Sequence, residues 1–173
     1  CIRDRTITLT SGALNIDKNL TIQGPGPNKL KISGNRASRV FVIQGGKVVT
    51  LAGLTITGGV ADKSSPIVVS IGGGVLSFGS LTLSNDVVSD NEALGGAIPG
   101  FGPGYAIAGG VASFGTLDVA ASQFTGNRVR GGDGGNAFNA GVALGGALGN
   151  FGGASATITD SHFTGNLARG GSG

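Results

Sequence analysis

The sequence contains no methionine and no tryptophan, and it has only one cysteine, one histidine and one tyrosine among its 173 residues. Because Cys1 is the only cysteine, no internal disulfide can stabilise the fold. A mature chain that starts with cysteine and lacks methionine is expected to be processed or trimmed. Charged residues are also scarce, at 12% against 39% hydrophobic residues. This balance excludes an intrinsically disordered chain, which combines high charge with low hydrophobicity.

A collagen period and helical periodicity are absent as well. The 36 glycines follow no Gly-X-Y rule, although they are about three times the usual share. Two uncharged runs, 93–117 and 134–159, are long enough to suggest membrane spans, but their glycines and, in the first run, prolines make them too irregular for lipid-exposed helices. We expect both runs to be glycine- and alanine-rich loops that lead into buried strands.

A dense basic patch is also missing. Residues 1–63 carry nine Lys or Arg against three Asp, whereas residues 64–173 carry three Arg against six acidic residues. The basic residues of the first segment are spread out, with only Phe41 among them, so no nucleic-acid partner is expected. We expect a solvated, positively charged face. The opposite charges of the two segments would favour head-to-tail association of copies, which salt would screen.

A repeat of fixed period dominates what is present. Gly74, Gly110 and Gly146 are 36 residues apart each time, and the third copy gains three residues near GNFGGASA. The copies begin with GGVLSFGSLTLS, GGVASFGTLDVA and GGALGNFGGASATIT. Two glycine-rich stretches of 17 residues, 92–108 and 128–144, lie between them. Such a period predicts stacked units that bury a common core.

Short runs inside each copy, such as SLTLS (80–84) and TLDVA (116–120), alternate apolar and polar residues, as half-buried strands do. Similar runs continue upstream with a less regular period. We expect an all-β fold: a right-handed, single-stranded parallel β-helix of about six coils, with outward glycine-rich loops. The paired glycines are expected at sharp bends or at positive φ.

Equivalent residues of stacked coils would meet along the axis of such a helix. We expect two apolar columns and one asparagine ladder whose amides bond along the axis: Phe78, Phe114 and Phe151; Val88, Phe124 and Phe163; and Asn91, Asn127 and Asn166.

The GGVL, GGAI and GGAL segments, with FTGN in two copies, resemble the paired GGAI and FxxN motifs of polymorphic outer-membrane proteins of the chlamydial type and of related bacterial β-helix surface proteins. Residues 7–35 are similar to the opening coils of such proteins. The resemblance implies one β-helix segment over 1–173, with irregular coils in 1–59 and repeats at 73–108, 109–144 and 145–173. The first copy departs from the motif, with VVSDN in place of FTGN, and no C-terminal cap or translocator barrel follows. We therefore expect a fragment of a longer surface protein.

No catalytic, cofactor or metal site is expected. His162 should point outward beside Phe163. The densest acidic group is Asp86, Asp90 and Glu92. A polysaccharide-cleaving β-helix needs several carboxylates from adjacent coils. In the repeat register Asp86 aligns with Ser and Asp90 with Gly, so we expect these acids to be solvated loop residues.

Threonine columns on a flat face would instead suit ice binding. Thr21, Thr55, Thr82 and Thr157 occupy the middle of strand-like triplets, but Lys31 and Asp118 interrupt any such column. Ice binding therefore remains an alternative, as does polysaccharide binding or cleavage.

The expected function is non-enzymatic: a secreted or cell-surface structural or adhesive module of a bacterium, in a fibre or an autotransported passenger, with any membrane anchor outside this segment. Phe101, Tyr105 and Phe138 lie on the glycine-rich stretches and are the expected contacts. Their partner would be a surface protein or glycan of a host or neighbouring cell, or further copies stacked head to tail. Loops folded back over the coils are the alternative for these aromatics.

Overall fold

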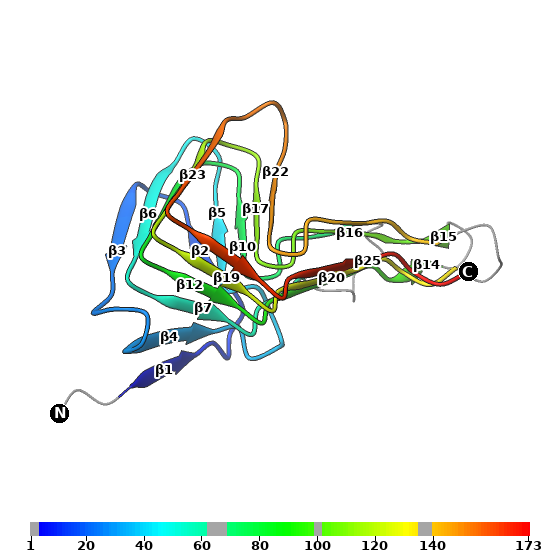
Figure 1. Cartoon of the computed structure of the whole chain (residues 1–173), viewed down its shortest axis with the longest axis horizontal. Helices are drawn as coiled ribbons and strands as arrows, with labels where there is room; N and C mark the ends of the chain where they lie inside the picture. The colour runs from blue at the N-terminus through cyan, green and yellow to red at the C-terminus, as the bar shows by residue number, and fades with distance from the viewer. Residues whose placement is uncertain (1–3, 62–68, 99–101, 135–139) are drawn as a thin grey trace.

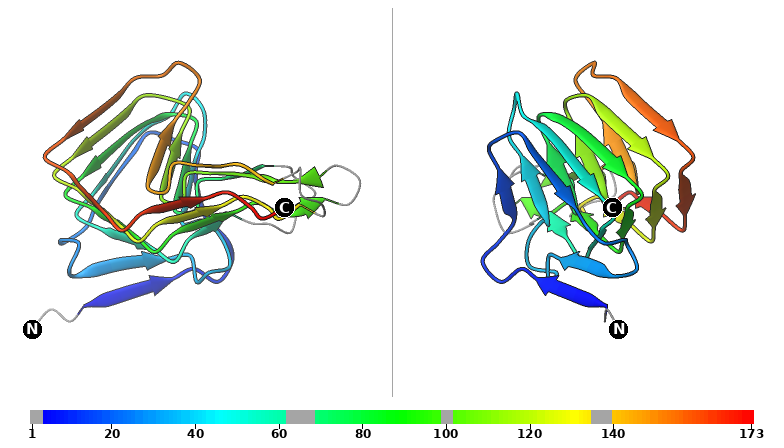
Figure 2. Two further views of the ribbon diagram at one scale, coloured as in Figure 1. Left: turned by 45° about the vertical axis from the view of Figure 1, so that its right-hand side comes forward. Right: turned by 90° about the vertical axis from the view of Figure 1, so that its left-hand side faces the viewer.

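The computed structural model describes residues 4–61, 69–98, 102–134 and 140–173, and no helix is present among them. The strands form a parallel β-solenoid, which confirms the expected fold class (Figure 1). Each turn follows three faces of a triangular prism, and the later turns also run out along a projecting arm and back (Figure 2). The chain therefore consists of a prism and an arm built from the same turns.

Three parallel sheets form the prism, and each receives one strand from every turn. Sheet A contains β1 (Arg5–Thr8), β4 (Leu30–Ser33), β7 (Thr55–Thr57), β12 (Val87–Ser89), β19 (Gln123–Thr125) and β24 (His162–Thr164). Sheet B contains β2 (Leu14–Ile16), β5 (Phe41–Ile43), β10 (Val75–Ser77), β17 (Val111–Ser113) and β22 (Leu148–Asn150). Sheet C contains β3 (Leu20–Gln23), β6 (Val48–Ala52), β11 (Ser80–Ser84), β18 (Leu117–Ala120) and β23 (Ala156–Thr159).

Two further parallel sheets and a small hairpin form the arm. Sheet D, the outgoing layer, contains β8 (Val60–Ala61), β13 (Glu92–Leu94), β20 (Arg128–Arg130) and β25 (Leu167–Arg169). Sheet E, the returning layer, contains β9 (Val69–Ile71), β16 (Tyr105–Ile107) and β21 (Ala143–Leu144). The antiparallel pair β14 (Ala97–Ile98) and β15 (Gly102–Pro103) lies near the far end.

The expected number of about six coils is wrong. Only about three turns, β5–β9, β10–β16 and β17–β21, contribute a strand to all five parallel sheets, and partial turns flank them. The strands β1–β4 pass through the prism sheets alone, and the last strand, β25, belongs to sheet D, so the first and last turns do not reach all five sheets. The stretches expected as loops, 92–108 and 128–144, contain paired strands instead.

The core fills the prism and results from strict alternation along its strands. In β11, Leu81 and Leu83 are buried while Ser80, Thr82 and Ser84 are partly exposed. Parallel, in-register pairing then places each inward-facing apolar residue next to an inward-facing apolar residue of the neighbouring coil. The largest fully buried side chains are Phe41, Phe124, Ile43, Leu51, Leu54, Ile56, Leu81, Leu83, Leu117, Val40, Val49 and Val75.

The register of the third copy differs from the expected one. Gly110 is equivalent to Ala147 rather than to Gly146, because Val111 pairs with Leu148. One extra residue lies in the arm before Ala143, and two more lie between β22 and β23. The insertion is therefore split between the arm and the corner from sheet B to sheet C, where added length disturbs no ladder.

The arm is thin because its two layers meet through alanine and glycine. Ala61, Ala93, Ala106 and Val129 form a small buried cluster between sheets D and E. Farther out the layers bond backbone to backbone, for example from Gly132 N to Gly104 O at 2.8 Å.

The paired glycines at the junction of arm and prism serve the same close approach. Gly73, Gly74, Gly109 and Gly110 do not have positive φ, whereas Gly145 of the third pair does. A Cβ on Gly74 would lie 2.7 Å from Gly110 O, so the reason for glycine at this position is space.

Candidate functional site

The residues of each of the two predicted apolar columns lie next to one another in the structure. Phe78 stacks on Phe114 with ring centroids 5.4 Å apart, and Phe151 follows at 5.5 Å. This column lies at the outer corner between sheets B and C, where Phe78 is exposed. The second column is inside the prism, because Phe124 is fully buried and pairs with Val88. Phe163 stacks on Phe124 at 4.8 Å.

The three predicted asparagines form a hydrogen-bonded ladder beside the arm. Asn91 Nδ2 donates to Asn127 Oδ1 at 3.0 Å, and Asn127 Nδ2 donates to Asn166 Oδ1 at 2.9 Å. Each acceptor oxygen also receives the backbone N–H of the asparagine before it. Asn91 and Asn127 are completely buried. The ladder therefore satisfies buried backbone groups at the corner where each turn leaves the prism for the arm.

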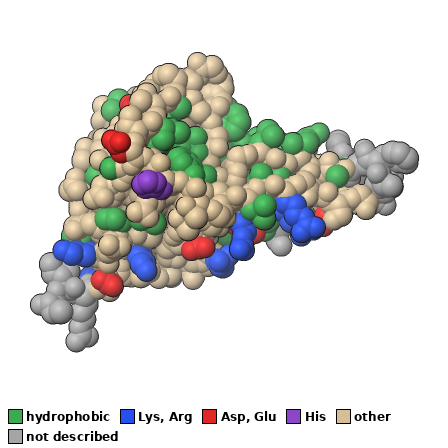
Figure 3. All heavy atoms as spheres, in the orientation of Figure 1, with side chains coloured by type: hydrophobic (Ala, Val, Ile, Leu, Met, Phe, Trp, Pro, Cys, Tyr) green, Lys and Arg blue, Asp and Glu red, His purple; other side chains and the backbone are tan. Residues whose placement is uncertain are grey.

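The two outer faces of the arm differ in character. The outer side of sheet E carries two columns of apolar residues, which together we name the apolar face. The only hydroxyl group among them is that of Tyr105. The columns consist of Val69, Tyr105 and Val142, and of Ile71, Ile107 and Leu144. The outer face of sheet D carries four charged side chains, Glu92, Arg128, Arg130 and Arg169, beside Val60, Leu94 and Leu167. Figure 3 shows the hydrophobic side chains along one side of the arm and Lys and Arg side chains along the other. The arm is therefore a two-layered blade with one apolar and one largely charged surface.

Tyr105 is the one predicted contact residue that the structure describes. It is 44% exposed and lies on the central strand of the apolar face. Phe101 and Phe138, the other two, lie outside the described residues. Sequence reasoning missed Val142 and Leu144, although VAL (142–144) and YAI (105–107) both have a larger side chain on either side of an alanine.

A groove runs across this apolar face. It has a volume of about 300 Å³, and its lining consists of Tyr105 and aliphatic residues: Val69, Ala106, Ile107, Val142 and Leu144. Such a concave apolar surface suits an apolar partner, because it offers a charged or glycan ligand only one hydroxyl to bind.

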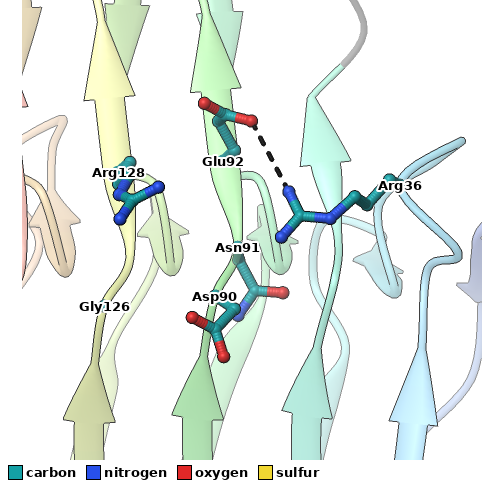
Figure 4. A pocket seen from close by; sticks show the side chains of 6 residues that line it. All are labelled: Arg36, Asp90, Asn91, Glu92, Gly126 and Arg128. Atoms are coloured by element: carbon teal, nitrogen blue, oxygen red, sulfur yellow. Dashed lines mark ion pairs between the residues drawn. The ribbon is translucent and has the colours of Figure 1, made fainter.

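A charged cleft lies on the opposite side of the blade, at the base of sheet D (Figure 4). Arg36, Asp90, Glu92 and Arg128 line it together with Asn91 and Gly126. Its volume is only about 10 Å³, enough for one water molecule. Arg36 and Glu92 are 3.9 Å apart, and the Arg36 side chain is exposed, so this ion pair adds little stability.

Asp86 is not the solvated loop residue expected from the sequence. It is 1% exposed and lies at the corner between sheets C and A. Its Oδ1 accepts the N–H of Leu54 at 2.8 Å and its Oδ2 accepts that of Ser84 at 3.1 Å. Its own N–H donates to Ser122 Oγ. Asp86 therefore forms hydrogen bonds with both neighbouring coils. A short polar side chain is needed at this corner of each turn to accept the backbone N–H of the preceding coil.

We expect the stability of the chain to fall between about pH 4 and pH 8 because of this carboxyl. Burial raises the pKa of Asp86 to about 7, although the two backbone N–H groups lower it in part. The folded state therefore binds the proton more tightly than the unfolded state. The resulting stability is complete below the unfolded pKa and is lost as the pH rises through about 7. The loss is on the order of 4 kcal/mol.

Asp86→Ser provides the comparison, because Ser122 and Ser161 occupy the same column and also accept the backbone N–H of the equivalent residue in the preceding coil. Denaturant unfolding of both proteins across this pH range should give a falling free energy of unfolding for the original chain and a much flatter profile for the variant. Parallel profiles would contradict a buried, protonated Asp86.

The remaining predicted positions offer no clustered chemistry. His162 is exposed, as expected. Asp133 accepts hydrogen bonds from Ser172 N–H and Oγ, and from Arg130, and these bonds hold its pKa below the usual value. Across the described ranges, no three His, Cys, Asp or Glu side chains lie close enough to hold a metal ion. In the same part of the chain, no helix has the length and hydrophobicity to cross a membrane.

The chain was also compared with known proteins. No protein-family model, no curated protein and no solved structure matches it.

Proposed function

We propose that this chain is a non-enzymatic structural and adhesive module, secreted or displayed on a bacterial cell surface, in a fibre or an autotransported passenger. The observation that carries this function is the blade-like arm, which projects from the prism and exposes Tyr105, Val142 and Leu144 on its apolar face. Exposed apolar side chains that a stiff scaffold holds in place are typical of contact surfaces.

The stiffness of the scaffold supports such a role. Sheets A, B and C run through the whole prism with parallel, in-register pairing, and the asparagine ladder ties successive turns together. A solenoid of this kind transmits force along its axis, because each turn contacts its neighbours over its whole length. The resemblance of the GGAI and FxxN motifs to those of bacterial surface proteins agrees with this placement.

The proposed function is tested with labelled, purified chain and a panel of bacterial and host cells. We expect saturable binding to some of them, which is lost in Tyr105→Lys and kept in Leu167→Lys. Leu167 is a suitable control because it is 50% exposed and lies on the opposite face of the arm. Binding that tolerates Tyr105→Lys would exclude the apolar face as the contact.

The same preparation tests the enzyme alternative. We expect a panel of acidic polysaccharides to remain uncleaved. Cleavage that disappears in Asp90→Asn would replace the adhesive function by a polysaccharide-cleaving one, with the charged cleft as its site.

Ice binding is a second candidate because the structure contains a longer hydroxyl column than the sequence predicted. Thr55 belongs to sheet A and is buried, so it does not share a column with Thr21, Thr82 and Thr157. A different outward column of sheet A consists only of Ser and Thr: Thr8, Ser33, Thr57, Ser89, Thr125 and Thr164. Thermal hysteresis that vanishes in Thr125→Leu would support this candidate over adhesion.

A further inference from the structure

We propose that the apolar face is a self-association surface, and that its occupant is the same face of a second copy of this chain. Because this face belongs to the arm, the interaction rests on the proposed function and names one partner for it. Two copies related by a two-fold axis would pack sheet E against sheet E, as the two layers of a β-sandwich do.

The chemistry of the face restricts its occupant. Six side chains on three strands offer one hydroxyl group, that of Tyr105, and no charge. A glycan or a nucleic acid needs several hydrogen-bond donors or cations, and the arginines of the arm lie on sheet D instead. The occupant must therefore be apolar and must fit the groove on this three-stranded sheet. A second copy of the face meets both conditions.

The shape of the face is compatible with its own copy. Tyr105 stands on the central strand β16, between Val69 on one side and Val142 on the other. The groove beside it holds about 300 Å³ and is lined by aliphatic side chains apart from this ring. In a two-fold arrangement each groove would receive the ring of the partner's Tyr105, so the same contact is made twice.

The area of the face sets the strength of the contact. Tyr105, Val142 and Leu144 are 44–49% exposed, and the other three members are half-buried. A patch of this kind measures on the order of 400 Å². Two such patches would bury about 800 Å², below the roughly 1,200–2,000 Å² of stable complexes. We therefore expect a reversible dimer with a dissociation constant above about 10 µM, which becomes important where many copies are displayed together.

The chain carries its own probe for this contact. Tyr105 is the only tyrosine and tryptophan is absent, so the ultraviolet fluorescence reports on the apolar face. Sedimentation velocity and quenching of tyrosine fluorescence by iodide are measured from about 5 µM to about 1 mM. We expect the mean mass to rise toward that of a dimer and the quenching to fall over the same range.

Leu144→Lys and Leu167→Lys form the matched pair of variants. These leucines are 49% and 50% exposed, on opposite faces of the arm. Leu144→Lys places two charges in the dimer contact and should raise the dissociation constant by at least about tenfold. Leu167→Lys should leave it within about threefold. Circular dichroism melting curves of both variants verify that the fold is intact.

Three outcomes would overturn the interaction. The chain stays monomeric with constant quenching, or it dimerises equally well in Leu144→Lys, or it forms a series of longer oligomers. The last outcome would indicate stacking of prism ends, where Ile7, Leu14 and Leu20 at one end and Ile158 and Phe163 at the other are exposed. Loss of dimers with retained cell binding would leave the proposed adhesive function in place.

Discussion

Replacing Asn127 by alanine is expected to lower the free energy of unfolding by about 3–6 kcal/mol, a large part of the stability of a typical domain. The side chain of Asn127 is completely buried and accepts from both the backbone N–H and Nδ2 of Asn91. It also donates to Val88 O at 2.9 Å and to Asn166 Oδ1. Alanine would leave these buried groups without partners at the corner between the prism and the arm, in a central turn that water does not reach.

Denaturant unfolding followed by circular dichroism measures this loss. Asn166→Ala is the matched control, because Asn166 makes the same kinds of bonds but lies in the last turn and is only half-buried. We expect it to cost about 1–2 kcal/mol, since solvent can reach the groups left behind. Equal effects at the two positions would mean that the ladder does not depend on burial.

Gly109→Ala is expected to destabilise the chain by about 3 kcal/mol or more, or to prevent folding. A Cβ on Gly109 would meet the carbonyl oxygen of Arg128, and it would lie 2.6 Å from both Arg128 N and Gly146 O. These atoms belong to the backbone of two neighbouring strands. No side-chain rotation can therefore relieve the overlap, and the turn must separate from its neighbour.

Gly45→Ala is the control for this prediction. Its Cβ would find only Phe78, at 4.0 Å, and its φ is not positive. We expect a change within about 0.5 kcal/mol, as for an ordinary surface substitution. Thermal melts of both variants distinguish a loss of space from a general cost of adding a methyl group, and similar melting temperatures would contradict the tight junction.

The ladders could be predicted from sequence because parallel, in-register pairing sets each residue on its equivalent one turn away. A 36-residue period then specifies that Phe114 lies between Phe78 and Phe151 and that Asn127 lies between Asn91 and Asn166. No knowledge of the turns or corners is needed for this step. The same rule identified the fold class, since only stacked coils bury the apolar side of such short strands.

The arm could not be predicted, because its packing leaves almost no apolar pattern. Its strands are two or three residues long, and the side chains between its layers are mostly alanine, with glycine beyond them. Backbone bonds such as that from Gly141 N to Gly132 O replace side-chain contacts there. A stretch of this composition reads as a loop by the usual turn signals, although glycine is the residue that lets two backbones meet.

The burial of Asp86 was missed for a different reason. An acidic residue beside Asn85 has the composition of a solvated turn. The signal lay in the column rather than in the segment, because Ser122 and Ser161 both bond the backbone of their own turn. Short polar residues at a repeated corner indicate that the position bonds the backbone and is closed to water.

The number of repeats determines how wide the blade is. Each 36-residue unit contributes one strand to sheet D and one to sheet E, and neighbouring strands are about 4.8 Å apart. Gain or loss of one unit would therefore broaden or narrow both outer faces of the blade by one row of side chains. For the adhesive function proposed above, the number of units would thus set the strength of attachment.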